Sequence, residues 1–355
     1  MALVELGIEH KGIPATLVAC VRFNLKGRSE VAGIFEDLAC AIPEEQIAGP
    51  PYLILQYFSS YTEGYEAEAG FPVKRPFEDG WIKSKLSPAM EVLSVTHRGA
   101  PEGLRESRGK LSQFSRKHAL ISDEFTREVY PDWPNPEGAI ELQFVIHPWN
   151  ALFAENLERA LGTARSETVL AGAEALTVMS TPEQRFRWAK AALEQLDKSA
   201  SEQEQFEVLS RCAHVYPPGQ LEKLKRVYNE ARSDSDDPLV AVDAVRAFMR
   251  SDPGWNDEAG YRQGHVVYHT KNPADPEAYE QAKTAEEKRA AYCFCPVIRE
   301  RLDGGMPTSY CYCGAGWYRQ QWETATGKPV RVEVVQSVLR GNEVCQFAVH
   351  LAEDL

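Results

Sequence analysis

The feature that most constrains the fold is a repeat without gaps in the first 150 residues. Shifting residues 15–73 by 73 positions places them on 88–146, and one order of strand-like and helix-like segments then occurs twice. Few superposed positions are identical, so the argument depends on the shared order at a constant offset. We predict an α+β fold whose N-terminal part is a duplicated β-α-β-β pair with pseudo-two-fold symmetry.

The bounds of these elements follow from apolar spacing and from the prolines that punctuate the joins. In the first unit we expect one helix at 29–42 and strands at 15–23, 52–58 and 66–73. In the second unit we expect one helix at 102–117 and strands at 89–97, 124–130 and 139–147.

The last predicted strand places an acid on one face. Successive side chains of a strand point to opposite faces, so Glu141 and Gln143 face away from the aliphatic Leu142. The offset superposes Glu68 on Glu141. We therefore expect both carboxylates in one ligand cleft between the two units, with Glu141 as the central polar contact. For Glu66 we prefer a solvated position on the sheet.

Four aromatic residues are candidates for contacts with the same ligand. The offset superposes Tyr57 on Tyr130, and we expect Trp81 and Trp133 near the rim of the cleft. Core packing is the alternative interpretation for each of them.

Three segments of this region resemble a known family. They are GPPYLILQY with EAEAGFPV, then VLSVTHRGAPEGL, then TREVYPDWPNPEGAIELQFVI. Together they resemble the GyrI-like small-molecule-binding domain, which is also the effector-binding domain of AraC- and BmrR-type regulators. The resemblance covers residues 1–150. It implies a ligand cleft between two pseudo-symmetric halves and multidrug-type binding of aromatic or cationic compounds.

The resemblance also implies which residue meets the ligand. In related domains an acid on the last strand contacts a cationic ligand, and by position that acid is Glu141. A carboxylate in a low-dielectric pocket attracts a cation, and tyrosine rings add about 0.5–2 kcal/mol of cation–π attraction. Some family members resemble hydrolases that open strained electrophilic rings. A hydrolase that uses Glu141 as its base is therefore a second interpretation, and the sequence leaves open whether the chain is an enzyme.

The second half of the chain, 151–355, has a helical pattern that ends in a cysteine-rich α/β cap. Helices are expected after Thr181, over 201–216, and then at 219–231, 238–250 and 317–326, followed by strands at 329–339 and 344–351. Residues 285–355 resemble domains related to the aminothiazoline-carboxylate hydrolases and to bacteriochlorophyll 4-vinyl reductase. We carry over no catalytic residue from this resemblance.

Five of the eight cysteines lie in the last 63 residues. Cys293, Cys295, Cys311 and Cys313 supply four thiolates in two pairs, which could hold zinc. The one-residue gap within each pair is shorter than the usual spacing of two to four residues. Three interpretations stay open: a zinc or other thiophilic-metal site, a reactive thiol, and buried or redox-active cysteines without a ligand.

Charge and hydropathy exclude several classes of protein. The formal net charge is −13, which is unfavourable for binding a phosphate backbone, and no helix-turn-helix candidate precedes the first strand. No apolar run is long enough to span a membrane, and the N-terminus lacks a signal pattern. We predict a cytoplasmic protein that binds a small organic ligand and neither nucleic acid nor membrane. A hydrolase and a metal- or redox-responsive regulator are the alternatives.

Overall fold

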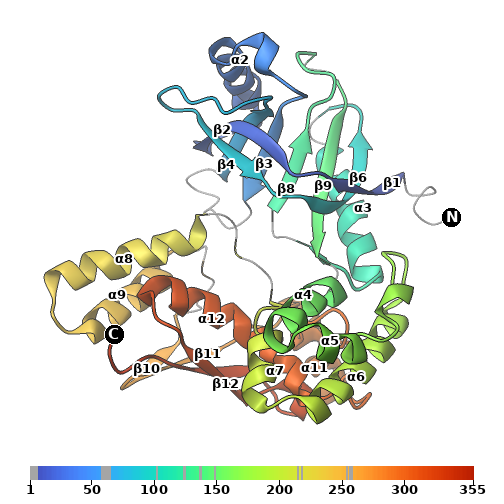
Figure 1. Cartoon of the computed structure of the whole chain (residues 1–355), viewed down its shortest axis with the longest axis vertical. Helices are drawn as coiled ribbons and strands as arrows, with labels where there is room; N and C mark the ends of the chain where they lie inside the picture. The colour runs from blue at the N-terminus through green and yellow to red at the C-terminus, as the bar shows by residue number, and fades with distance from the viewer. Residues whose placement is uncertain are drawn as a thin grey trace. The chain divides into compact units, whose positions relative to one another are not determined.

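The computed structural model describes residues 7–56, 65–100, 103–122, 125–135, 138–147, 149–213, 216, 219–252, 255 and 259–355. The fold is mixed, with α-helices and antiparallel β-sheet (Figure 1). The chain divides into two compact units. Unit 1 comprises Met1–Arg116 and Ser122–His147, and unit 2 comprises Lys117–Ile121 and Pro148–Leu355.

Unit 1 is built on one antiparallel sheet with the strand order β1-β6-β9-β8-β3-β4-β2-β5. These strands are β1 (Ile8–Ile13), β2 (Thr16–Leu25), β3 (Tyr52–Gln56), β4 (Tyr65–Pro72), β5 (Lys83–Ser87), β6 (Met90–His97), β8 (Phe125–Val129) and β9 (Ile140–His147). A short strand, β7 (Ile121–Ser122), lies where the chain passes between the units. The unit also contains α2 (Val31–Ala41), preceded by the 3-10 turn Arg28–Glu30, and α3 (Leu104–Lys117).

The strand order reads alike from both edges of the sheet. From one edge it runs β1-β6-β9-β8, and from the other β5-β2-β4-β3, so that β3 and β8 meet at the centre. Adding 73 to the bounds of β3 gives those of β8, and the first residue of α2 maps onto the first residue of α3. All six predicted strands and both predicted helices of this region are present, within three residues at each end. The duplication itself stays a prediction.

Both helices pack against the same face of this sheet. Phe35 and Leu38 of α2 belong to one buried cluster with Leu53, Ala69 and Phe71. On α3, Ser107 Oγ lies 3.1 Å from Nδ1 of His97, a residue of β6. The alternation of a strand therefore leaves the opposite face, which carries Glu68 and Glu141, for other contacts.

Unit 2 combines helices with a four-stranded antiparallel sheet of order β10-β11-β13-β12. The strands are β10 (Tyr261–Gln263), β11 (Val266–Thr270), β12 (Arg331–Gln336) and β13 (Gln346–His350). The helices are α4 (Trp149–Leu161), α5 (Thr163–Val169), α6 (Pro182–Ser199), α7 (Glu202–Leu209), α8 (Gln220–Asp234), α9 (Pro238–Ser251), α10 (Pro276–Gln281), α11 (Ala285–Tyr292) and α12 (Tyr312–Thr326).

The helix starts in unit 2 have clear local causes. Thr181 accepts a hydrogen bond from the backbone N–H of Gln184 while the Gln184 side chain accepts one from the N–H of Thr181, which is the predicted capping box. Two apolar clusters fill the unit, and Trp322 and Tyr318 of α12 are fully buried in one of them. None of the helices in the described part of the chain has the length and the apolar run that a membrane crossing requires.

Candidate functional site

The two predicted acids lie on the same face of the unit-1 sheet. Strand pairing aligns Arg22, Glu68, Ile54, Arg127 and Gln143 as directly opposed neighbours across five adjacent strands. Directly opposed residues share a face and are near enough to interact. Glu141 occupies the next row of this face, opposite Val129. We call the row from Arg22 to Gln143 the central row and the face that carries it the site face.

Glu68 is a buried carboxylate with three donors. Its Oε2 lies 2.6 Å from Nζ of Lys85 and 3.3 Å from Nε of Arg22, and its Oε1 accepts a hydrogen bond of 3.1 Å from the Tyr52 hydroxyl. Burial, and then the charge of Glu68, raise the pKa of Tyr52 well above its usual value, so the hydroxyl remains a donor. The ion pairs and hydrogen bonds offset the cost of burying this charge.

Glu141 is less buried and has two partners. Nζ of Lys11 lies 2.6 Å from its Oε1, and the Gln143 side-chain amide donates to the same oxygen at 2.7 Å. Lys11 comes from β1 and Lys85 from β5, the two edge strands of the sheet. Each of the two predicted acids is thus paired with a lysine from the edge strand on its own side. The hypothesis of a hydrolase that uses Glu141 as its base stays a prediction.

Arg127 lies between these two acidic groups on the central strand β8. Its Nη1 donates to Gln143 Oε1 at 2.5 Å, and its guanidinium carbon lies 5.0 Å from the centre of the Tyr52 ring. Burial is the first cause that lowers the pKa of Arg127 from its usual value. Within the described part of the chain, Arg127 has no carboxylate at ion-pair distance. Sequence reasoning missed this residue, although its alternation with Glu128 places it on the site face.

The structure does not bring the predicted aromatic residues to the site face. Tyr130 packs against Phe35 of α2 with ring centres 4.9 Å apart, and Trp133 packs against Phe71 at 5.3 Å, so both lie on the helix-covered face. The expected grouping of Tyr130 and Trp133 with Glu141 is therefore wrong in geometry, and core packing accounts for their positions. Trp81 is 49% exposed. Tyr57 lies outside the described residues.

A second acid, Glu128, is buried on the helix-covered face. Its side chain is 0% exposed and accepts hydrogen bonds from Arg28, Arg108 and Tyr130. Burial, and then the charge of Glu128, raise the pKa of Tyr130, which keeps its hydroxyl protonated as a donor. Because Glu128 is enclosed by these donors and joins both halves of unit 1, we interpret it as a structural centre.

The four C-terminal cysteines do not form a ligand set. Cys311 and Cys313 lie where a 3-10 turn enters α12 and not in a strand, so their side chains point in different directions. Cys311 Sγ lies 3.0 Å from Ser337 Oγ, whereas the Cys313 thiol donates to the carbonyl of Cys212 at 3.0 Å. Among the described residues, which include all eight cysteines, no group of three or more potential metal ligands is found. The predicted zinc site at Cys293, Cys295, Cys311 and Cys313 is wrong.

One buried histidine of unit 2 has structural partners. His269, on the strand β11, accepts a hydrogen bond of 2.9 Å from the Trp322 indole and stacks on Tyr318.

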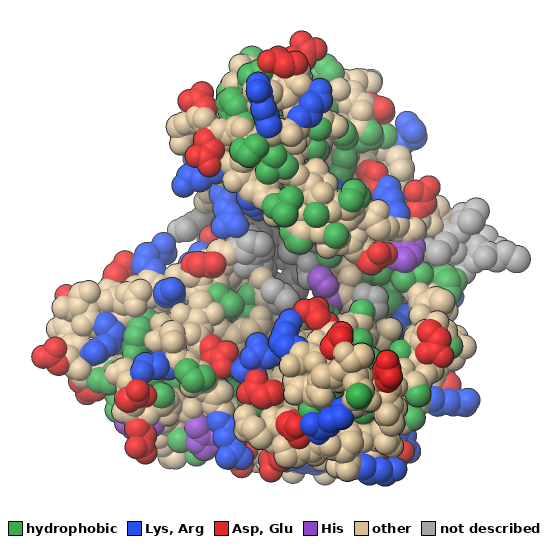
Figure 2. Space-filling model, in the orientation of Figure 1, with side chains coloured by type: hydrophobic (Ala, Val, Ile, Leu, Met, Phe, Trp, Pro, Cys, Tyr) green, Lys and Arg blue, Asp and Glu red, His purple; other side chains and the backbone are tan. Residues whose placement is uncertain are grey.

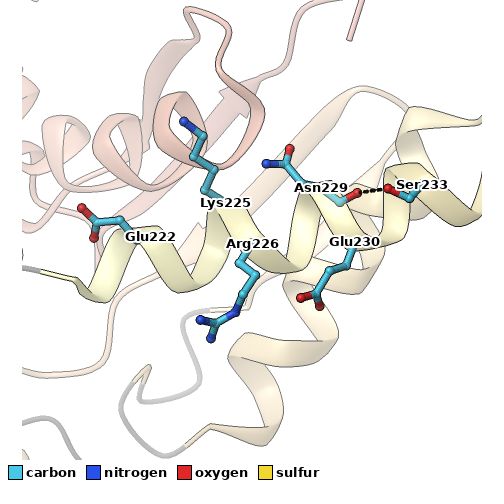
Figure 3. Close-up of a pocket in the computed structure, with 6 residues that line it drawn as sticks. All are labelled: Glu222, Lys225, Arg226, Asn229, Glu230 and Ser233. Atoms are coloured by element: carbon cyan, nitrogen blue, oxygen red, sulfur yellow. Dashed lines mark hydrogen bonds between the residues drawn. The ribbon is translucent and has the colours of Figure 1, made fainter. Parts of the chain in front are cut away.

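A surface hollow of unit 2 runs along α8 and is lined by side chains of that one helix (Figure 3). The lining residues are Glu222, Lys225, Arg226, Asn229, Glu230 and Ser233. Figure 3 shows their side chains pointing apart, and the Ser233 hydroxyl bonds to the carbonyl of Asn229 in its own helix. This arrangement is an exposed helix surface with no convergent polar groups.

The net negative charge is not gathered into one region on the face drawn in Figure 2, where acidic and basic side chains are interspersed over both units. Local charge arrangement therefore matters more for the site than the overall balance.

No protein-family model and no curated protein matches the chain. Among solved structures, the chain is similar to the EcmrR C-terminal domain, with 23% identity and a TM-score of 0.34 over 39% of this chain and 96% of that one. It is also similar to SAV2435 bound to tetraphenylphosphonium, with 12% identity and a TM-score of 0.30 over 41% and 96%. A hydrolase from Listeria innocua is similar with 12% identity and a TM-score of 0.30, over 39% of this chain and 91% of that one. These similarities concern the fold of part of the chain.

Proposed function

We propose that unit 1 binds a small organic molecule with an anionic group on the site face of its sheet. One observation carries this proposal. The guanidinium of Arg127 is mostly buried and has no ion-paired carboxylate among the described residues, whereas Glu68 and Glu141 each have a lysine partner. Among the described residues, the charge at the centre of this face that has no ion pair of its own is thus positive, and Glu141 is a carboxylate that acts on it electrostatically without forming an ion pair.

Elementary electrostatics favours an anion at this position. Removing a cation from water is costly unless an opposite charge or several hydrogen bonds replace the lost hydration. A guanidinium presents its donors in a planar fork that matches a carboxylate, sulfonate or phosphate group. Gln143 accepts from one nitrogen of Arg127, which holds the group in place.

The apolar part of the ligand has neighbours on the same face. Val18, Cys20, Tyr52 and Val129 form a buried cluster with Ile54 packed against it, and Ile54 is the direct cross-strand neighbour of Arg127. A ligand with an anionic head and an apolar or aromatic body would satisfy both features.

This proposal revises the expectation of a cationic ligand. A cation at Glu68 or Glu141 would have to compete with ammonium groups that lie 2.6 Å from each carboxylate. At Arg127, by contrast, no carboxylate among the residues described forms an ion pair, although the charge of Glu141 acts on the guanidinium.

Fluorescence titration with three probes tests the proposal. The probes are anilinonaphthalene sulfonate, its uncharged analogue N-phenylnaphthylamine, and the cation tetraphenylphosphonium, used as a competitor. We expect Arg127→Gln to weaken binding of the sulfonate about tenfold or more, because a hydrogen bond to a charged group contributes about 1.5–3 kcal/mol. Binding of N-phenylnaphthylamine should stay within about twofold of the wild type.

The matched control is Arg105→Gln, which removes the same charge from an exposed position on α3. It should leave all three affinities unchanged. Equal loss of sulfonate binding in both variants would indicate a general charge effect and contradict the proposed role of Arg127. Tight binding of tetraphenylphosphonium that is lost in Glu141→Gln would support the cationic alternative instead.

A further inference from the structure

A pair of cysteines in unit 2 lies outside the site described above. Cys293 follows the last residue of α11 and has extended backbone angles, φ −74° and ψ 123°. Cys295 precedes Pro296, which also disfavours helical geometry at Cys295. In extended backbone, residues two apart lie on the same side of the chain, at a separation that a disulfide can span.

Two cations contact the residue between these cysteines. Nζ of Lys271 lies 4.9 Å from the ring centre of Phe294, and the Arg299 guanidinium donates to the carbonyl of Phe294 at 2.9 Å. Phe294 is 46% exposed and Cys295 is half-buried, whereas Cys293 is only 4% exposed. Cys295 is therefore the more exposed of these two cysteines.

The two thiols have opposite electrostatic surroundings. A hydrogen bond from Cys293, and then the charges of Lys271 and Arg299, lower the pKa of Cys295 below its usual value. The same contact and burial raise the pKa of Cys293. Burial raises the pKa of Cys212, Cys311, Cys313 and Cys345, so these thiols are poor nucleophiles.

We propose that Cys293 and Cys295 form a thiol oxidation site that reacts with hydroperoxides. A low-pKa, accessible cysteine beside a second thiol is the arrangement found in redox-sensing cysteines. Cys295 is the attacking thiol and Cys293 is the resolving thiol. The proposal is independent of ligand binding in unit 1.

The proposed oxidation of the two thiols proceeds in two steps. The Cys295 thiolate attacks the distal oxygen of the hydroperoxide, an S–O bond forms, the O–O bond breaks, and the leaving alkoxide takes a proton from solvent to become an alcohol. Cys293 then loses its proton to solvent and attacks the sulfur of the Cys295 sulfenic acid. The S–S bond forms, the S–O bond breaks, and the hydroxide leaves as water. Two thiols are oxidised by two electrons, and one hydroperoxide is reduced.

Peptide mass spectrometry of the full chain tests this proposal. The reduced protein is treated with substoichiometric cumene hydroperoxide, with and without dimedone, which traps sulfenic acids. In the wild type we expect a disulfide within the tryptic peptide 290–299, which contains both cysteines. In Cys293→Ser we expect a dimedone adduct on Cys295, at least about fivefold above that on the exposed Cys40. Cys295→Ser should give neither product in this peptide.

A second pair of variants tests the cationic environment. Lys271→Met should slow oxidation of Cys295 severalfold at neutral pH, whereas Lys271→Arg should preserve the rate, and circular dichroism confirms that each variant folds. Oxidation of Cys40 ahead of Cys295 would overturn the proposal. A disulfide from Cys295 to Cys313 or Cys345 in the wild type would overturn the role given to Cys293.

Discussion

Replacing Gly316 with alanine is expected to lower the free energy of unfolding of unit 2 by about 3 kcal/mol or more. Gly316 lies in α12, where a Cβ atom would meet the carbonyl oxygen of Ser210 at 1.8 Å and the Cβ of Ala213 at 2.9 Å. The first distance is far below van der Waals contact, and the obstacle is backbone rather than a flexible side chain. The helix would have to move away from the segment that follows α7.

Helix propensity alone predicts that Gly316→Ala would raise the free energy of unfolding instead of lowering it. Alanine in a helix interior is about 1 kcal/mol more favourable than glycine, because glycine loses more conformational freedom on folding. The matched control is Gly33→Ala in α2, where a Cβ would meet nothing within 4 Å. We expect Gly33→Ala to raise the stability of unit 1 by about 0.5–1 kcal/mol.

Denaturant unfolding followed by tryptophan fluorescence and circular dichroism measures both changes. Trp322 is buried beside Ala315 and Tyr318 in one apolar cluster of unit 2, so its exposure on unfolding contributes to the change in emission of the seven tryptophans. If Gly316→Ala proved as stable as the wild type, the close approach of α12 to Ser210 would be incorrect.

The elements of unit 1 that form its core could be predicted from sequence, whereas its edge strands could not. Apolar alternation identified strands such as 139–147, and helical spacing identified 29–42. The edge strands β1 (IEHKGI) and β5 (KSKLS) lack a clear apolar face, as is usual where charged residues protect a sheet edge. They escaped prediction for that reason.

Because the edge strands were not predicted, prediction of the site was also incomplete. Alternation correctly placed Glu68 and Glu141 on one face, but their lysine partners lie on the two unrecognised edge strands. The prediction also depended on which residues of β8 face the site and which face the helices. Arg127 faces the site and Glu128 faces the helices, yet the superposition of Tyr57 on Tyr130 directed attention to the wrong face. The alternation of side chains along β8 would have assigned Arg127 and Glu128 to their faces if the helix-covered face had been identified first.

In unit 2 the predicted α8, α9, β12 and β13 agree with the structure to within a few residues. The residues around Cys311 and Cys313 were not predicted to be helical, because the helix was expected to start at residue 317. The helix α12 begins at Tyr312, five residues before the predicted start, and this turns the two thiols toward different partners. A glycine-rich start hid the helix, since Gly314 and Gly316 have low helix propensity. The close approach of α12 to Ser210 explains why residue 316 is a glycine.

Replacing Glu128 with alanine is expected to destabilise unit 1 by about 3–5 kcal/mol. Its carboxylate accepts from both terminal nitrogens of Arg28, from Arg108 at 2.9 Å and from the Tyr130 hydroxyl at 2.8 Å. Truncation leaves the two guanidinium groups without this counter-charge in a mostly buried position, and that penalty exceeds the value of the hydrogen bonds alone. Arg28 precedes α2, whereas Arg108 belongs to α3, so the loss affects both halves of the unit at once.

Two comparisons separate this network from ordinary surface charge. Glu106→Ala removes an exposed acid that pairs with Lys110 on α3, and it should change stability by less than about 0.5 kcal/mol. In a double-mutant cycle, Arg28→Met and Glu128→Ala should be strongly non-additive, because the second substitution removes a partner that the first has already lost. Unfolding in guanidinium chloride gives the free energies of unfolding of the wild type, the two single variants and the double variant. Additive effects, or a loss below about 1 kcal/mol for Glu128→Ala, would mean that Glu128 is not a structural centre. In that outcome its carboxylate, with Tyr130 and Trp133 on the same face, would become the stronger candidate for contact with a ligand.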